Sequence, residues 1–256
     1  MKKHQIRNSI IVIIAFLVAY FGKKACAPFF TISLDEQLYK IIVFYAWWLL
    51  PSLLTVAWLF GFKNMIDAIG LKNGFYKGFA FAFITVLPML LSSAIVGQID
   101  ASINWLSLIQ KTLLAGVMEE YLFRGFLFGL LFLKFGWGFI PSSLLGALIF
   151  GMGHVYQGNN LAASVGVFMI TGIGAIWFAW LYVEWNNNLW VPICLHVLMN
   201  LSWSLFDVSG SAIGGPMANL FRIITIALTV VITINNGKKQ GFKVNKKNLF
   251  LHSKVP

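Results

Sequence analysis

Two neighbouring carboxylates and an arginine lie within an apolar stretch of the chain, residues 113–132. A charge at the centre of a bilayer costs from about 2.5 kcal/mol upward, so Glu119, Glu120 and Arg124 need partners inside the protein. Glu120 and Arg124 stand at positions i and i+4, a spacing that predicts an ion pair along one helix face. Glu119 points about 100° away around the helix and has no local partner. It is therefore free to face side chains from other segments.

Two other apolar stretches carry side chains that can serve as those partners. His154 follows residues 150–153 in one stretch, and His196 lies in the other. Asn200 stands four residues after His196, so one helix face presents an imidazole and an amide to the same small volume. The rest of the chain is interpreted as the scaffold that brings these three segments together.

This combination of side chains suits the hydrolysis of a peptide bond. A carboxylate and an imidazole near one water molecule can remove its proton, which is general-base catalysis. Imidazole and amide N–H groups can then bind the oxyanion that develops on the substrate. Alternatively, Glu119, His154 and His196 would be three ligands of a catalytic zinc ion with an open position. The residues themselves fit both mechanisms.

The composition indicates a membrane protein that crosses the bilayer several times. The chain is 59% hydrophobic and 11% charged, whereas a soluble domain has about 25% charged residues. No long polar segment interrupts its 256 residues, which predicts a single membrane-embedded domain over 1–256, with a motif-bearing core at about 113–207 and a basic tail at about 236–256. The net charge of +11 gathers in loops and tails that flank apolar segments, so it does not indicate nucleic-acid binding.

An all-α fold of about eight transmembrane helices is predicted, because a helix needs roughly 20 apolar residues to cross the bilayer. The expected spans are about 9–21, 41–60, 79–96, 113–132, 141–154, 161–183, one around His196, and 217–234. Lysine and arginine favour one side of these spans, which predicts that both termini are cytoplasmic. The basic tail is expected to lie on an anionic inner leaflet. Cys26 and Cys194 show no pairing motif, so no disulfide is expected.

The depths of the motif residues conflict with simple straight spans. Counting ~1.5 Å per residue places Glu119 about 10 Å below one membrane face and His196 about 9 Å from the other. Across a core of about 30 Å the two side chains would not meet. Either the helices are tilted, or the helix of His196 begins nearer Trp185 and residues 186–188 sit in a water-filled cavity. The second explanation is favoured, because hydrolysis needs water and polar backbone is tolerated where it lines a cavity.

Three motifs, each on its own apolar segment, resemble those of a known family. In chain order they are Glu119-Glu120-x-x-x-Arg124, Phe150-x-x-x-His154 and His196-x-x-x-Asn200. The pattern is similar to that of the CPBP family of intramembrane proteases, which includes the CAAX-type prenyl endopeptidases and bacterial relatives associated with bacteriocin processing and self-immunity. The resemblance covers about residues 113–200 and includes the eight-helix plan.

The resemblance implies a role for each motif residue. Glu119 would be the base that activates water together with His154, and His196 and Asn200 would line the oxyanion site. Glu120 and Arg124 would be supporting residues. The family is often labelled as metalloproteases, although a metal-free glutamate mechanism is also proposed for it, so zinc stays an alternative.

The leading hypothesis is an intramembrane endopeptidase that cuts a peptide precursor or a membrane-associated substrate near the bilayer surface, in a bacterial plasma membrane. A second hypothesis is a non-enzymatic immunity or regulatory protein that keeps the polar core for folding or partner binding. A third, a proton-coupled transporter, would predict internal repeats, and no convincing repeat is found. The expected partners are the peptide or membrane-protein substrate and the lipid bilayer, without nucleic acid.

Overall fold

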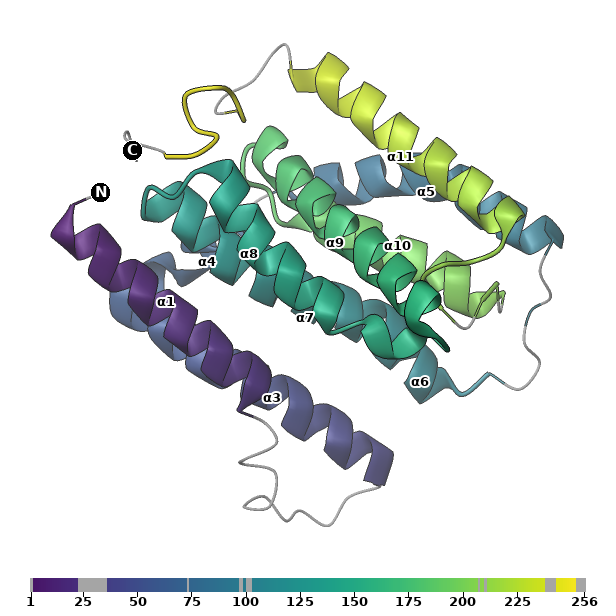
Figure 1. The fold of residues 1–256 in the computed structure, drawn as a ribbon, viewed down its shortest axis with the longest axis horizontal. Coiled ribbons are helices and arrows are strands. Elements are labelled where there is room, and N and C mark those ends of the chain that lie inside the picture. The colour runs from purple at the N-terminus through teal and green to yellow at the C-terminus, as the bar shows by residue number, and fades with distance from the viewer. Residues whose placement is uncertain are drawn as a thin grey trace.

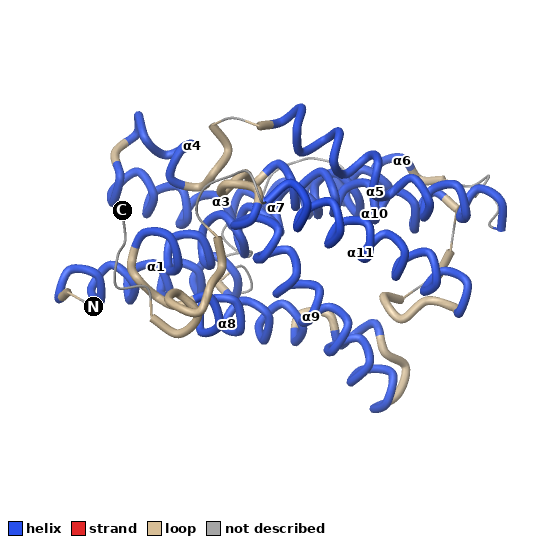
Figure 2. Tube along the Cα trace, turned by 90° about the horizontal axis from the view of Figure 1, so that it is seen from above, coloured by secondary structure: helices blue, strands red, loops and turns tan. Residues whose placement is uncertain are grey.

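The computed structural model describes residues 2–22, 36–72, 74–96, 99, 103–206, 208–209, 211–237 and 243–251, and every regular element in them is a helix (Figures 1 and 2). This result confirms the all-α prediction. The α-helices are α1 (Lys3–Phe21), α3 (Glu36–Phe60), α4 (Met65–Ala68), α5 (Phe75–Val96), α6 (Trp105–Ile109), α7 (Ala115–Glu120), α8 (Phe139–Met152), α9 (Leu161–Glu184), α10 (Trp190–Leu205) and α11 (Pro216–Gly237). Short 3₁₀ turns are η2 (Phe62–Asn64) and η6 (Val155–Gln157).

Six helices in the described part of the chain are long and apolar enough to cross a membrane: α1, α3, α5, α8 with its extension to Gln157, α9 and α11. The other two predicted spans differ from simple long helices. The helix that carries His196, α10, has 16 residues, and the segment that carries Glu119 is divided into short helical pieces. The prediction of about eight spans is therefore approximate.

The segment with the paired carboxylates contains π-helical turns. Helices α6 and α7 are joined by η3 (Gln110–Leu114), and α7 is followed by η4 (Tyr121–Phe128) and η5 (Leu130–Lys134), all three of which are π-helical. Such turns are rare and occur frequently at functional sites. Every side chain from Tyr121 to Leu133 is buried, so this segment forms the centre of the bundle.

Helix α10 begins among buried residues. It starts at Trp190, whose ring N–H donates to the carbonyl of Leu71 (3.1 Å), and the neighbouring Leu189 and Val191 are fully buried. The expectation that this helix begins nearer Trp185 is therefore wrong. Because the residues around this helix start are buried, His196 lies deep enough in the bundle to meet the carboxylates.

The C-terminal segment folds back onto the bundle, near the N-terminus (Figure 1). The amides of Gly138, Phe139 and Ile140 at the start of α8 donate to carbonyls of residues 248–250, at 3.2, 2.8 and 2.9 Å. The amide of Val244 donates to a carboxylate oxygen of Glu184. The described part of the tail, 243–251, is thus bound to the protein, while 238–242 and 252–256 lie outside the described residues. Contact of the tail's lysines with a leaflet stays a prediction.

Candidate active site

Glu120 connects the first motif to the third. Its Oε1 atom lies 3.1 Å from Nη1 of Arg124, which is the ion pair that the i, i+4 spacing predicts. The same oxygen lies 2.7 Å from Nδ1 of His196, on α10. The side chains of Glu120 and Arg124 are 0% and 2% exposed. A fully buried carboxylate therefore holds both a guanidinium and an imidazole.

The contact with Glu120 determines which ring nitrogen of His196 carries the hydrogen. A carboxylate can only accept a hydrogen bond, so Nδ1 of His196 carries the hydrogen and donates it to Glu120. In the neutral ring the other nitrogen, Nε2, then has a free lone pair. Nε2 lies 3.9 Å from Oε2 of Glu119, too far for a direct hydrogen bond. The two carboxylates thus flank one imidazole, whose free nitrogen faces Glu119.

The side of the site that holds Glu119 is open, whereas the side that holds Glu120 is closed. The side chain of Glu119 is 19% exposed and that of His196 is 12% exposed. Tyr20 of α1 and Tyr45 of α3 lie within electrostatic reach of Glu119. Sequence reasoning missed both tyrosines, because neither has a spacing relation to any motif.

His154 lies at the carboxyl end of α8 and contacts its own helix. Its Nδ1 atom donates to the carbonyl of Phe150 (2.7 Å), and its ring lies on the Phe150 ring with centroids 4.4 Å apart. The preceding residue, Gly153, lies against Tyr20, because a Cβ atom at Gly153 would be 2.1 Å from the tyrosine hydroxyl. His154 therefore joins the site through Phe150 and the Tyr20 side, and it makes no direct hydrogen bond to Glu119 or His196 among the described residues.

Asn200 lies one turn beyond His196 on α10. Its side-chain amide donates to the backbone carbonyl of Lys111 in η3 (2.9 Å). This bond uses one of the two amide hydrogens and ties α10 to the segment that leads to Glu119. The second hydrogen is available to an incoming group.

Aromatic rings surround the guanidinium group of Arg124. Its Cζ atom lies 4.8 Å from the centroid of the Phe150 ring, 5.4 Å from that of Phe178 and 6.0 Å from that of Phe123. Phe178 also stacks on the ring of His196, with centroids 5.6 Å apart. Cation–π contacts of this kind are stronger when the cation is desolvated. These rings therefore contact both partners of Glu120, the guanidinium of Arg124 and the imidazole of His196.

The zinc alternative needs Glu119, His154 and His196 close together. Among the described residues, no group of three His, Cys, Asp or Glu side chains is placed so that it could hold a metal ion. The Nδ1 atoms of both histidines are bonded to protein oxygens, which leaves Nε2 as the only ring nitrogen of each that could bind a metal. The three side chains therefore do not form a ligand set in this arrangement, and metal use stays a prediction.

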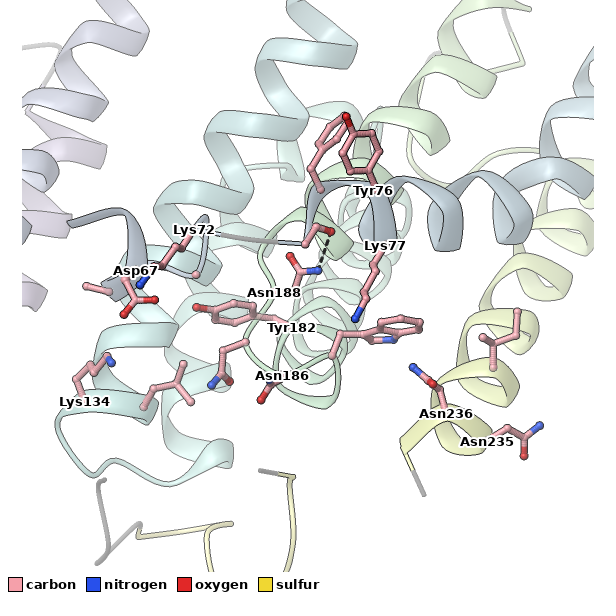
Figure 3. A pocket seen from close by; sticks show the side chains of 18 residues that line it. Asp67, Lys72, Tyr76, Lys77, Lys134, Tyr182, Asn186, Asn188, Asn235 and Asn236 are labelled. Atoms are coloured by element: carbon pink, nitrogen blue, oxygen red, sulfur yellow. Dashed lines mark hydrogen bonds between the residues drawn. The ribbon is translucent and has the colours of Figure 1, made fainter. Parts of the chain in front are cut away.

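A cavity lies beside the asparagine turn, away from the motif residues (Figure 3). It has a volume of about 1140 Å³, and Lys72, Lys77 and Asp67 line it together with residues 186–188. The asparagine turn lines this cavity, whereas the sequence predicts that it lies in a water-filled cavity that supplies water for hydrolysis. No motif residue lines it, however, so this cavity is separate from the site around Glu119.

Comparison with known proteins agrees with the motif pattern. Residues 101–202 match the family model described as type II CAAX prenyl endopeptidase Rce1-like. This range begins before α6 and contains all six motif residues. No curated protein and no solved structure matches the chain closely enough to add to this finding. The six long apolar helices described above, together with this similarity, support an integral membrane protein. Residues 101–202 are thus similar to the type II CAAX prenyl endopeptidase Rce1-like family.

Proposed function

We propose that this protein is an intramembrane endopeptidase in which Glu119 activates water for attack on a peptide bond near the bilayer surface. The observation that carries the proposal is the placement of Glu119 opposite the free nitrogen of His196, with Oε2 and Nε2 3.9 Å apart. Glu119 is accessible, while Glu120 is buried and occupied by Arg124 and His196. The substrate is a peptide precursor or a segment of a membrane-associated protein.

The chemistry follows from these positions. A water molecule bound between Glu119 and His196 loses a proton to the carboxylate as its oxygen attacks the carbonyl carbon of the substrate. The neutral ring of His196 has no N–H at Nε2, so it becomes an oxyanion donor only when the proton that Glu119 took from the water passes on to Nε2. The free amide hydrogen of Asn200 is the second donor. The proton then passes to the leaving amide nitrogen as the C–N bond breaks, and His154 assists water activation.

The proposal includes the setting of the enzyme. Both termini lie in the cytoplasm, the membrane is a bacterial plasma membrane, and residues 1–256 form one membrane-embedded domain. The distribution of basic residues supports the orientation of the termini, because lysine and arginine accumulate on the cytoplasmic side of membrane proteins.

A non-enzymatic role in bacteriocin immunity or regulation is the second candidate. The buried pair of Glu120 and Arg124, enclosed by aromatic rings, favours it, because such a pair can serve folding alone. The two candidates differ in whether a proton must be transferred to Glu119.

The deciding experiment replaces Glu119 by Gln, which keeps the volume and removes the basicity. Cleavage should fall by at least ~100-fold, while the protein still folds and binds substrate. The matched control is Glu36→Gln, a carboxylate that is exposed and paired with Lys40 at the start of α3. Both variants are expressed at equal membrane levels in a deletion strain, and precursor processing is read by mass spectrometry. Full complementation by Glu119→Gln with normal processing would reject the protease function.

A further inference from the structure

We infer that the active site opens on the extracytoplasmic face of the membrane, so that its substrate is a peptide segment presented outside the cytoplasm. The part of this inference that concerns a substrate rests on the proposed function. The orientation itself rests on the charges and exposure of the described residues.

The bundle has two ends that the hydrogen bonds distinguish. The first, the motif end, holds Tyr20, Lys111 and His154: Tyr20 lies against Gly153, and Asn200 binds the carbonyl of Lys111. The second, the basic end, holds the start of α1, the turn before α8 and the end of α9. There the ring N–H of Trp137 donates to Ser9 (3.0 Å), and the amide of Val244 donates to Glu184.

Glu119 lies closer to the motif end. At ~1.5 Å per residue it is roughly 12 Å from Lys111 but roughly 22 Å from Lys134 along the same helical segment. The side chains between Glu119 and the basic end are closed to solvent, because Glu120 and every residue from Tyr121 to Leu133 are buried. Toward the motif end, Leu113 and Lys111 are exposed. Water and substrate therefore reach Glu119 from the motif end.

Basic residues gather at the opposite end. The described basic residues at the basic end are Lys2, Lys3, Arg7, Lys63, Lys72, Lys77, Lys134, Lys243, Lys246 and Lys247. At the motif end the described basic residues are Lys40, which is paired with Glu36, Lys111, and Arg222, which donates to the carbonyl of Ala212. Lys23 and Lys24 directly follow α1 in the sequence. They lie outside the described residues, so they are not counted at either end. This asymmetry places the basic end in the cytoplasm and the motif end outside it.

The orientation defines the class of substrate. A chain end held at the cytoplasmic leaflet would lie on the far side of the bundle from Glu119. A peptide that has crossed the membrane, or the outer flank of a membrane-anchored protein, reaches the open side directly. The rim there carries exposed apolar side chains, among them Tyr156 (79% exposed), Leu161 (82%) and Trp105 (67%).

Two matched asparagines allow a direct test of orientation. Asn159, in the turn between α8 and α9 at the motif end, and Asn64, after α3 at the basic end, are both exposed. Each is replaced by Cys in a full-length protein that carries Cys26→Ser and Cys194→Ala. A membrane-impermeant maleimide is then applied to intact cells and to permeabilised cells. Asn159→Cys should be labelled in intact cells, whereas Asn64→Cys should be labelled only after permeabilisation.

Labelling of Asn64→Cys alone in intact cells, or of both variants, would overturn the inference. A second measurement does not depend on cysteine reactivity: green fluorescent protein fused after residue 256 should fluoresce, because it folds in the cytoplasm, and a dark fusion at normal expression contradicts the orientation. The result is independent of the protease test. Reversed labelling with Glu119-dependent cleavage refutes only the orientation, and the expected labelling without cleavage refutes only the proposed function.

Discussion

The Nδ1 atom of His196, on α10, lies 2.7 Å from the Oε1 atom of Glu120, on α7, although the two residues are far apart in the sequence. Because that oxygen also pairs with Arg124 at 3.1 Å, the position of the imidazole depends on a buried ion pair in the neighbouring segment. Glu120 is therefore a positioning residue. It selects the ring nitrogen that carries the hydrogen and leaves the other nitrogen toward Glu119.

Removing one charge of this pair should destabilise the fold. Arg124→Met leaves Glu120 buried and uncompensated, which costs roughly 3–5 kcal/mol. Thermal unfolding in detergent measures the loss. A wild-type melting temperature for Arg124→Met would show that the pair does not contribute to folding.

Double variants separate positioning from folding. Glu120→Leu with Arg124→Met removes both charges and should recover most of the stability, yet cleavage should stay low because Nδ1 of His196 has lost its acceptor. Glu120→Gln with Arg124→Met retains an acceptor oxygen and should cleave faster than the first double variant. Equal cleavage by the two, at equal stability, would remove the positioning role of Glu120.

Gly116 sets the distance between α7 and α10. A Cβ atom at Gly116 would lie 2.6 Å from Cγ2 of Val197 and 3.0 Å from its backbone nitrogen. Gly116→Ala should therefore force α10 away beside His196, cost about 1–3 kcal/mol and reduce cleavage. Gly146→Ala is the matched control, since that buried helical glycine has only ordinary contacts, at 3.9 Å and beyond. It should be neutral or stabilising by about 0.5–1 kcal/mol in chemical or thermal unfolding.

Loss of the Asn200 amide should weaken oxyanion binding. Asn200→Ala is expected to lower the cleavage rate by roughly 10²- to 10³-fold. It also removes the bond to Lys111, so thermal stability must be measured in parallel. A fall in stability with an unchanged rate per folded molecule would assign Asn200 to packing only.

Chelation tests the zinc alternative. With Glu119 as the base, protein freed of metal by a chelator should keep its cleavage rate. Elemental analysis before and after treatment provides the control. About one metal ion per chain, together with abolished cleavage after removal and recovery on adding zinc, would establish the metal mechanism instead.

The sequence predicts the helical class and the ion pair because both depend on local periodicity. Runs of apolar residues determine the helices, and the i, i+4 spacing brings Glu120 and Arg124 together in any helix. The order of the three motifs also identifies which segments must meet. These relations hold whatever the arrangement of the bundle.

The cross-helix contacts do not follow from the same reasoning. Which carboxylate binds His196 depends on the depth of α10, and Leu71 and the turn before Trp190 determine that depth. Tyr20 approaches Glu119 only because α1 packs on the central segment. No spacing in the sequence encodes these distances.

The hydrogen bonds at the start of α8 have a consequence for the order in which the protein is completed. The free amides at this helix start find their acceptors in residues 248–250, which leave the ribosome long after α8 itself. While translation continues, the helix that leads to His154 lacks these acceptors. A nascent chain that has not reached residue 248 has none of these acceptor carbonyls. A chain that extends past residue 250 can hydrogen-bond the free amides of α8 with its own tail.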